Sequence, residues 1–365
     1  MATRKLKFMF AGGGTGGHLF PALALAETLR ILRPDAEFLF VGTRDRIESR
    51  VVPEHGFPFR AIWISGYQRR RILRNVLVPL KVVVSLLQSF FLIKRFKPDL
   101  VVGTGSYVCA PVLFMASVIG IPTVLHESNS YPGITTKLLA RRMTKVYTAF
   151  ESVARWLPGV ASLDTIGTPT RLSLGTVSRE KGCAAFGVDA SRTIVLITGG
   201  SLGAASVNRA VLDNIDKLLA LDIQLIWQTG NADIDRVRKS VGNKAAGWIG
   251  PFITNMAEAY AAADLIVARS GATTVAELCV VGKPAILIPY PHAAEDHQTH
   301  NARALEEVGA AVMIPDLELP TRFVEIVTAL LRDAVRRRNM KEAFQRFGRQ
   351  HAGTTIAKKI LELVE

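Results

Sequence analysis

The stretch Phe8-Met-Phe-Ala-Gly-Gly-Gly-Thr-Gly-Gly-His18-Leu-Phe-Pro21 decides how the first half of the chain folds. An apolar run enters this stretch, and an Ala- and Leu-rich pattern typical of a helix follows it over residues 22–32. The glycines between Gly12 and Gly17 permit positive φ and let a ligand come close to the backbone. The sequence therefore predicts a strand, a tight turn and a helix whose N-terminus binds anions or lone pairs.

His18 is the reactive side chain of that turn. A helix N-terminus carries partial positive charge, which disfavours the imidazolium form and keeps a histidine neutral and basic near pH 7. The alternative is that His18 only caps the helix and that the glycines only make a tight turn. We expect a chemical role for His18, because the second half of the chain supplies the rest of a site.

The composition of the 365 residues indicates two domains and an anionic partner. The net charge of +14 suits nucleic acid, anionic lipid headgroups or phosphorylated substrates. The three cysteines, Cys109, Cys183 and Cys279, lie far apart and lack the spacing of metal ligands. We expect them to be small buried apolar residues, as in proteins of a reducing compartment. Because the N-terminus runs straight into a predicted strand, we expect no signal peptide and a cytosolic location.

Strand and helix patterns alternate along the chain, and loops rich in glycine follow several of the strands. A shift in character near residues 157–171 indicates a linker between two such series. The alternation predicts α/β domains, each a parallel sheet with helices on both faces and ligands at the carboxyl ends of the strands. Strands are expected at 7–11, 37–41, 99–102, 122–125, 193–197, 223–228, 247–250, 265–268 and, as the last one, 285–289.

Residues 69–97 break this pattern, because they are apolar with basic ends. Their apolar part, residues 76–93, barely reaches the length of a membrane span and contains Pro79, Lys81 and Gln88. An ordinary helix that covers the sheet would bury one face but would leave the remaining apolar residues unexplained. We therefore expect residues 69–97 to dock on an anionic membrane surface without spanning it.

In the second half, Ser270-Gly-Ala-Thr-Thr-Val-Ala-Glu277 has the pattern of a nucleotide site at the start of a helix. The small residues admit a phosphate to the helix N-terminus, and the two threonines add hydroxyl donors. Glu277 follows about one turn later, where its carboxylate can accept two hydrogen bonds from a ribose diol. A solvated helix residue is the less favoured interpretation of Glu277.

Two further residues are expected to contact the phosphates of the same nucleotide. Ser201 lies in the second glycine-rich loop, Gly199–Gly203, and Arg171 in the linker offers a bidentate cation. Two halves with opposed glycine-rich loops predict a cleft, with a nucleotide on one side and a second substrate on the other.

Other kinds of site fit less well. Gly12–Gly17 contains a dinucleotide fingerprint, but no acidic residue closes the second strand and no Walker lysine follows either loop. For Asp233 with Asp235, a solvated surface is favoured over a metal site, and for His292, His297 and His300 a loop and the start of a helix are favoured over a zinc site. The basic clusters are interleaved with Leu, Val and Phe instead of stacking aromatics, so we expect no nucleic acid partner.

These motifs together resemble the MurG family, whose members move N-acetylglucosamine from UDP to undecaprenyl-pyrophosphoryl-N-acetylmuramyl-pentapeptide (lipid I) and form lipid II. The matching stretches run from near residue 7 to the C-terminus in family order. They are Gly13-Gly-Thr-Gly-Gly-His18-Leu-Phe-Pro-Ala-Leu-Ala, His126-Glu-Ser-Asn129 with Pro132-Gly133, Gly199-Gly-Ser-Leu-Gly-Ala204, Arg269-Ser-Gly-Ala-Thr-Thr-Val-Ala-Glu277 and Asp296-His-Gln298-Thr-His-Asn301-Ala.

The resemblance implies an α/β fold of the GT-B type, with two Rossmann-like parallel-sheet domains facing a cleft. Residues 1–166, joined by a C-terminal helix at about 349–365, would form the acceptor and membrane-docking domain. Residues 167–348 would form the domain that binds the UDP-sugar donor.

The resemblance also assigns roles to single residues. His18 would be the general base that takes the proton of the acceptor's 4-hydroxyl, with Glu127 as the next candidate for that role. The remaining positions would bind substrate: Thr15, Gly16 and Gly17 the donor's sugar and phosphates, Asn129 and Gln298 the sugar, Arg171 and Ser201 the diphosphate, Ile253 the uracil through its backbone, and Ala272, Thr273, Thr274, Val275, Ala276 and Glu277 phosphate and ribose.

The activity implied is an inverting hexosyl transfer in peptidoglycan synthesis, with UDP-N-acetylglucosamine and lipid I as substrates. No cofactor and no metal ligands are expected, and Mg²⁺ would at most neutralise the diphosphate in solution. The implied location is peripheral, on the cytoplasmic face of the bacterial inner membrane, with other cell-wall synthesis proteins as further partners. A UDP-sugar epimerase or another glycolipid synthase of the same fold is the alternative. The family often has other residues at Ser106, Ser128 and His292, which affects only details of the acceptor loop.

Overall fold

The chain folds into two compact α/β units. The computed structural model describes residues 4–66, 76–200, 202–242, 244, 247–347 and 351–365. The first unit comprises Met1–Arg171 together with Gln350–Glu365, and the second comprises Leu172–Arg349. The sequence predicted the change of unit after residue 166, and the structure has it after Arg171.

The first unit contains a seven-stranded parallel sheet in the order β3-β2-β1-β4-β5-β6-β7. Phe8, Met9 and Phe10 of β1 are all fully buried, as expected for a central strand with helices on both faces. The chain returns from β3 to β4 beside β1, so the strand order reverses between β1 and β4. The strands are β1 (Lys7–Ala11), β2 (Glu37–Gly42), β3 (Phe59–Ala61), β4 (Leu100–Gly103), β5 (Thr123–Glu127), β6 (Lys145–Thr148) and β7 (Leu163–Thr165).

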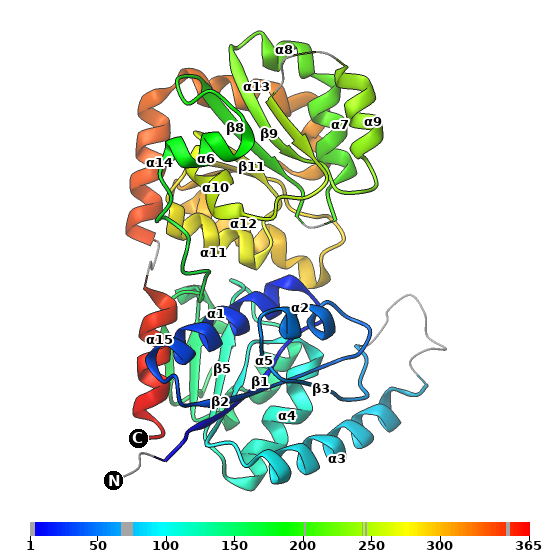
Figure 1. The fold of residues 1–365 in the computed structure, drawn as a ribbon, viewed down its shortest axis with the longest axis vertical. Helices are drawn as coiled ribbons and strands as arrows, with labels where there is room; N and C mark the ends of the chain where they lie inside the picture. Colours follow the sequence, from blue (N-terminus) through cyan, green and yellow to red (C-terminus); the bar gives the residue numbers. More distant parts are fainter. Residues whose placement is uncertain (1–3, 67–75, 201, 243, 245–246, 348–350) are drawn as a thin grey trace. The chain divides into compact units, whose positions relative to one another are not determined.

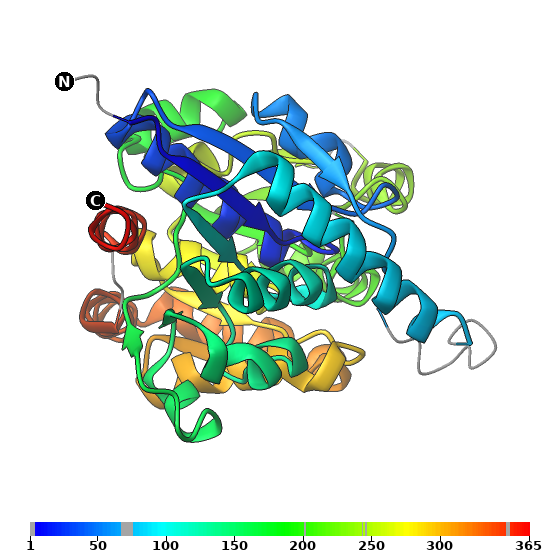
Figure 2. The same ribbon diagram turned by 90° about the horizontal axis from the view of Figure 1, so that it is seen from below.

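Helices cover both faces of this sheet (Figures 1 and 2). On one face α1 lies beside α15, and both bury apolar side chains against β1 and β2. On the other face α4 packs on the central strands, and α3 packs against α4. The helices are α1 (Gly16–Leu32), α2 (Glu48–Glu54), α3 (Val78–Phe96), α4 (Ser106–Ile119), α5 (Ile134–Leu139) and α15 (Ala352–Glu362), with 3₁₀ turns at Ala140–Arg142 and Glu151–Trp156.

The second unit repeats the design with a six-stranded parallel sheet in the order β10-β9-β8-β11-β12-β13. Its strand order reverses between β8 and β11, and the loops that follow these two strands carry the glycine-rich motif and the predicted nucleotide motif. The strands are β8 (Thr193–Thr198), β9 (Ile223–Gln228), β10 (Gly247–Gly250), β11 (Leu265–Ala268), β12 (Ala285–Leu287) and β13 (Ala311–Met313).

Figure 1 shows the helices of the second unit on both faces of its sheet. They are α6 (Arg179–Phe186), α7 (Ala205–Asp213), α8 (Ile215–Leu219), α9 (Ile234–Val241), α10 (Met256–Ala262), α11 (Ala272–Val281), α12 (His297–Glu307), α13 (Leu319–Arg332) and α14 (Ala334–Phe347), with 3₁₀ turns at Ala294–Asp296 and Asp316–Glu318. The predicted fold class, two doubly wound α/β domains with parallel sheets, is confirmed. The expectation that 285–289 is the last strand is wrong, because β13 follows it. β13 has only three residues, which are too few to show an alternating pattern in the sequence.

Candidate active site in two parts

The glycine turn after β1 lies against the loop after β4, and His18 joins the two. The Nδ1 atom of His18 lies 3.0 Å from the backbone oxygen of Thr104, and the Thr104 hydroxyl donates to the backbone oxygen of His18 at 2.6 Å. Because a carbonyl oxygen only accepts hydrogen bonds, Nδ1 must carry the proton. In the neutral ring the lone pair is then on Nε2, the atom that can accept a proton from a substrate.

The close approach of these loops explains two of the glycines. A Cβ on Gly105 would lie 2.6 Å from Nδ1 of His18, and Gly105 also has a φ of 99°. A Cβ on Gly12 would collide with the Thr104 hydroxyl. Larger residues at either position would therefore push the loops apart and break the bond that orients His18.

A buried carboxylate from α2 holds the turn from beneath. Glu48 is fully buried, and its Oε2 accepts a hydrogen bond from the backbone N–H of Gly14 at 2.9 Å. Its Oε1 accepts from the backbone N–H and from the hydroxyl of Thr43, at 3.0 and 2.7 Å. A Cβ on Gly13 would lie 2.6 Å from Oε1 of Glu48, so Gly13 admits this carboxylate. The N–H of Gly14 is thus engaged by the protein itself.

The carboxylate of Glu127, at the end of β5, accepts hydrogen bonds from residues of the loop that follows it. Its Oε1 accepts from the backbone and the side-chain nitrogens of Asn129, both at 3.0 Å. Its Oε2 accepts from the backbone N–H of Gly133 at 3.1 Å and from the Thr136 hydroxyl at 2.6 Å. These four bonds shape the loop that presents Asn129. The roles of Glu127 as a base and of Asn129 as a sugar ligand stay predictions.

His126 precedes Glu127 and connects β5 to the linker. Its Nε2 lies 2.9 Å from the Gly167 carbonyl oxygen and therefore carries a proton, while Nδ1 accepts from the Ser128 hydroxyl at 3.2 Å. Burial lowers the pKa of His126 below its usual 6.5. His126 is therefore a neutral structural histidine, and the sequence did not single it out.

The other predicted residues of the first unit lie around the start of α1. Thr15 is the N-cap residue of this helix, and Gly16 and Gly17 open its first turn. Arg171 lies with its guanidinium 5.2 Å from the ring centre of Phe20, which α1 carries one turn further on. The structure thus brings Thr15, His18 and Arg171 to the same end of one helix, whereas their contacts with substrate stay predictions.

In the second unit, the loop between β11 and α11 is anchored from α12. The Ser270 hydroxyl donates to the backbone oxygen of Gln298 at 2.8 Å, and Asn301 donates to the backbone oxygen of Ser270 at 3.2 Å. The side-chain oxygen of Gln298 accepts from the backbone N–H of Tyr290 at 3.0 Å. Its side-chain nitrogen lies 4.0 Å from where a Cβ on Gly271 would be. Gln298 therefore lies beside the N-cap of α11.

Helix α11 begins where the sequence predicted a phosphate site. Gly271 is its N-cap, and Thr273, Thr274 and Ala276 are partly exposed, whereas Ala272 and Val275 are buried. The apolar side chains of Ala272 and Val275 form no hydrogen bonds, so these two residues can bind a phosphate only through their backbone. Glu277 is buried as well, and its Oε2 accepts a hydrogen bond from the Tyr260 hydroxyl at 3.0 Å.

Gln228, at the end of β9, is a second organising residue that the sequence did not indicate. Its side-chain oxygen accepts from the backbone N–H of Ile253 at 2.8 Å, and its nitrogen donates to the backbone oxygen of Gly200 at 2.7 Å. It thereby ties the predicted uracil segment to the glycine-rich loop. Since the N–H of Ile253 already donates to Gln228, a uracil ring would have to form its hydrogen bond with the carbonyl oxygen of Ile253. Ser201 lies outside the described residues.

Arg269, which directly precedes the nucleotide motif, forms hydrogen bonds and an ion pair within the second unit. Its guanidinium donates to the Asp316 carboxylate at 2.5 Å and to the Ser206 hydroxyl at 2.9 Å, and it also reaches two backbone oxygens after β12. Ser206 in turn donates to Asp316 at 2.8 Å. Arg269 therefore stabilises the conformation of this loop.

Among the described residues, no three His, Cys, Asp or Glu side chains lie close enough together to form a metal site.

Comparison with known proteins agrees with this two-part arrangement. The glycosyltransferase family 28 N-terminal domain matches residues 8–148, and the glycosyltransferase family 28 C-terminal domain matches residues 194–358. The UDP-N-acetylglucosamine–N-acetylmuramyl-(pentapeptide) pyrophosphoryl-undecaprenol N-acetylglucosamine transferase of Salinibacter ruber is 41% identical over 100% of this chain and 99% of that protein. The protein of the same name from Chlorobaculum tepidum is 42% identical over 98% of this chain and 99% of its own length.

Solved structures show the same relationship. MurG of Acinetobacter baumannii superposes with a TM-score of 0.79 at 28% identity and covers 98% of this chain and 100% of that chain. A UDP complex of MnaA from S. aureus, at 15% identity and a TM-score of 0.69, covers 99% of this chain and 98% of its own and shares the fold alone. The chain is therefore a glycosyltransferase of family 28 and belongs to the MurG family.

Proposed function

We propose that this chain transfers N-acetylglucosamine from UDP-N-acetylglucosamine to lipid I, with inversion at the anomeric carbon, and so forms lipid II. The observation that carries the proposal is the full-length similarity, at about 40% identity, to transferases that bear this name. The tautomer of His18 supports it independently, because Nδ1–H donates to the Thr104 carbonyl oxygen and the lone pair of the neutral ring is therefore on Nε2.

In this proposal the second unit holds the donor. The N-terminus of α11 and the hydroxyls of Thr273 and Thr274 receive the diphosphate, and the Glu277 carboxylate accepts hydrogen bonds from the ribose diol. The Ile253 carbonyl oxygen accepts from the uracil, and Gln298 donates to the sugar hydroxyls. Arg171 and Ser201 add charge and a hydroxyl to the diphosphate.

The first unit supplies the base. The 4-hydroxyl oxygen of the acceptor sugar forms a bond to the anomeric carbon while the bond from that carbon to the β-phosphate oxygen breaks. The hydroxyl proton goes to Nε2 of His18, and UDP leaves with the electron pair. The positive charge that develops on the imidazole is shared with the Thr104 carbonyl through Nδ1–H, which holds the ring during transfer.

Replacement of His18 by Asn tests the assignment of the base. The Asn amide can still donate to Thr104 from a position near Nδ1, but it has no atom that accepts a proton in place of Nε2. We expect His18→Asn to bind UDP normally and to lose about 10²–10⁴-fold in turnover. The assay is transfer of radiolabel from UDP-N-acetylglucosamine to a butanol-extractable lipid I analogue. Near-normal turnover of this variant would refute the role of His18 and direct attention to Glu127.

No bound metal is required in this proposal, because the helix N-terminus and the hydroxyl donors stabilise the leaving diphosphate. Mg²⁺ would act on the diphosphate in solution. We expect transfer to persist in EDTA at a lower rate. Complete loss of transfer, restored only by a divalent cation, would contradict this part.

The proposal also places the chain on the cytoplasmic face of the inner membrane through α3. This helix has an unusual distribution of side chains, because Ser85, Ser89 and Ile93 are its buried residues. The two serine hydroxyls donate to backbone oxygens within the helix, so these buried polar groups have hydrogen-bond partners. The buried face of α3 is therefore a narrow strip of small side chains and Ile93. None of the helices in the described ranges combines the length and the apolar character that crossing a bilayer requires.

The apolar side chains of α3 instead point outward. Leu80, Leu87 and Phe91 are 52%, 55% and 66% exposed, and basic side chains follow at Lys94, Arg95 and Lys97. Apolar residues framed by cations suit the interface of an anionic bilayer. Of the predicted docking segment 69–97, residues 69–75 lie outside the described residues.

Co-sedimentation with vesicles tests the docking. We expect the wild-type protein to sediment with vesicles that contain phosphatidylglycerol, and we expect Leu87→Gln/Phe91→Gln to stay in the supernatant while keeping its turnover with a soluble acceptor. Equal sedimentation of both proteins would contradict the docking role of α3.

An epimerase of the same fold is the alternative function. It would release a new amino sugar from UDP-N-acetylglucosamine without any lipid acceptor. Incubation of the donor alone, followed by analysis of the sugars, separates the two functions, and we expect no acceptor-independent product beyond slow hydrolysis.

A further inference from the structure

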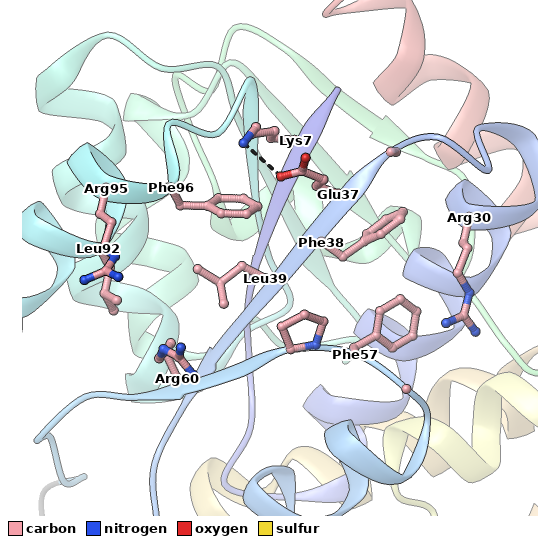
Figure 3. Close-up of a pocket in the computed structure, with 13 residues that line it drawn as sticks. Lys7, Arg30, Glu37, Phe38, Leu39, Phe57, Arg60, Leu92, Arg95 and Phe96 are labelled. Carbon is pink, nitrogen blue, oxygen red and sulfur yellow. Dashed lines mark ion pairs between the residues drawn. The ribbon is translucent and has the colours of Figure 1, made fainter. Parts of the chain in front are cut away.

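A hollow in the first unit lies at the amino ends of β1 and β2, the edge of the sheet opposite to the glycine turn (Figure 3). Its volume is about 550 Å³, its floor includes the buried rings of Phe38 and Phe57, and Lys7 on its rim pairs with Glu37 at 2.8 Å. None of the residues that line it takes part in the proposed transfer. Since parallel sheets bind their ligands at the carboxyl ends of the strands, further residues that act on the donor are expected at the carboxyl edge of the second sheet.

Gln228 stands at that edge, at the end of β9. Its side chain is buried, and burial of an amide is costly unless both of its ends form hydrogen bonds. Both ends do so here, because Oε1 accepts from the backbone N–H of Ile253 at 2.8 Å and Nε2 donates to the backbone oxygen of Gly200 at 2.7 Å. One side chain therefore connects the predicted uracil segment with the predicted diphosphate loop.

These two partners allow only one orientation of the amide. A backbone N–H can only donate and a carbonyl oxygen can only accept, so the amide oxygen must face Ile253 and the amide nitrogen must face Gly200. A rotation by 180° would bring donor against donor and acceptor against acceptor. Gln228 keeps both hydrogen bonds only while the two loops hold their positions relative to each other.

The glycine-rich loop also packs against the backbone that follows Gln228. A Cβ on Gly203 would collide with the carbonyl oxygen of Thr229, so the two backbones are in direct contact. That carbonyl oxygen accepts a hydrogen bond from the side chain of Asn208 at 2.8 Å, and Asn208 is itself buried. A shift at the end of β9 would therefore be transmitted to the glycine-rich loop.

The uracil segment is joined to the same strand end from the other side. The N–H of Thr229 donates to the oxygen of Gly250 at 3.0 Å, and the N–H of Gly230 donates to the oxygen of Pro251 at 3.1 Å. These bonds continue the pairing of β9 with β10 to within two residues of Ile253. The end of β9 is thus the common support of both loops.

We propose that Gln228 is a positioning residue that couples the two halves of the donor site. A base that binds at Ile253 fixes the amide of Gln228, and the amide fixes Gly200, so the diphosphate loop is already ordered when the phosphates arrive. The inference rests on the proposed function and deepens it, because the base and the diphosphate of the donor then bind cooperatively.

Two substitutions separate this role from general support of the fold. Gln228→Glu keeps an oxygen for the N–H of Ile253, but the ionised carboxylate has no hydrogen to donate to Gly200. Protonation restores that donor, and burial raises the pKa of a carboxyl toward neutral pH, so the variant should recover as the pH is lowered. Gln228→Met has a similar length and forms neither hydrogen bond.

Gln224→Glu is the matched control. It places the same change on the same strand, near the amino end of β9. The side-chain oxygen of Gln224 accepts from the backbone N–H of Asp189 at 2.7 Å, and a carboxylate can keep that bond. The control therefore adds the same charge to the second unit without altering the proposed coupling.

The test compares the binding of UDP with the binding of uridine to the full-length protein, by calorimetry and by NMR titration, at pH 8 and pH 6. Uridine reports on the base half alone. At pH 8 we expect Gln228→Glu to bind UDP about tenfold more weakly than the wild type and to bind uridine within about twofold of it. At pH 6 its affinity for UDP should return to within about threefold of that of the wild type. Gln228→Met should bind both ligands more weakly at both pH values, and Gln224→Glu should match the wild type.

Equal weakening of UDP and uridine in Gln228→Glu would overturn the proposal, since Gln228 would then support only the uracil segment. An affinity of this variant for UDP that is the same fraction of the wild-type value at both pH values would also overturn it, as would normal UDP binding by Gln228→Met. If Gln228→Met does not fold, the pH dependence of Gln228→Glu decides. A wild-type protein that fails to bind UDP would instead refute the proposed function, so the two failures are distinguishable.

Discussion

The carboxylate of Glu48 accepts a hydrogen bond from the backbone N–H of Gly14 at 2.9 Å, across 34 residues of sequence. In dinucleotide-binding folds the N–H groups of such a turn face a phosphate. Here a fully buried negative charge engages one of them and also holds Thr43 at the end of β2. The N–H of Gly14 is therefore engaged by the protein, which fixes the turn that carries His18, whereas the contacts of Thr15, Gly16 and Gly17 with the donor stay predictions.

Glu48→Gln should disturb this loop and slow catalysis. The Gln amide presents a donor to an N–H or a hydroxyl that needs an acceptor, so at least one buried group loses its partner. We expect about 10- to 100-fold lower kcat, from misplacement of His18, with little change in the affinity for UDP. Steady-state kinetics and calorimetric titration with UDP measure the two effects. Glu54→Gln, on the same helix and exposed, is the control and should behave as the wild type.

Glu277 can be tested without disturbing its neighbour. In Glu277→Gln the amide oxygen still accepts from the Tyr260 hydroxyl, but the charged acceptor for the ribose diol is lost. Hydrogen bonds to a charged group contribute about 1.5–3 kcal/mol, so we expect roughly 10- to 100-fold weaker binding of UDP and an unchanged kcat. Tyr260→Phe, which keeps the carboxylate, should weaken binding by less. A fall in kcat with unchanged UDP affinity would contradict a ribose contact.

The sequence predicted the parallel α/β architecture because apolar runs such as Phe8–Phe10 are buried on both faces and polar loops follow them. It also predicted that the motifs around His18 and Glu277 follow the carboxyl ends of strands, where parallel sheets bind their ligands. What it missed depends on long-range partners. Glu48 lies among charged residues that have the pattern of a surface, and Gln228 meets Ile253 only because β9 ends beside that loop.

Short elements and the orientation of helices were also beyond prediction. β3 and β13 have three residues each, so they show no alternation that a pattern could reveal. The apolar content of α3 predicted a helix at the membrane, but the burial of Ser85 and Ser89 depends on how closely the helix packs against α4. A periodic pattern alone would have buried the apolar face.

The ion pair of Arg269 with Asp316 should stabilise the second unit when it is complete and destabilise it when it is broken. Both side chains are largely buried, so Arg269→Met leaves Asp316 without its cation and should lower the free energy of unfolding by about 3–5 kcal/mol. Replacement of both, Arg269→Met/Asp316→Leu, removes the uncompensated charge and should recover most of that loss. Denaturant unfolding of the four proteins gives the coupling energy, and strictly additive effects would argue against a coupled pair.

His126 should make stability depend on pH in a definite direction. Burial lowers its pKa in the folded protein below the value of 6.5 that it has when exposed, so the unfolded chain binds the proton more readily. The stability contributed by neutral His126 is therefore fully present above about pH 6.5 and is lost as the pH falls below it. His126→Gln has no proton to gain, and its amide can still donate to the Gly167 carbonyl. We expect the difference in unfolding free energy between wild type and His126→Gln to shrink as the pH is lowered from 7.5 to 5, measured by denaturant titration in matched buffers. A difference that stays constant across this range would show that His126 does not titrate on unfolding, and a growing difference would mean that the folded protein stabilises the imidazolium.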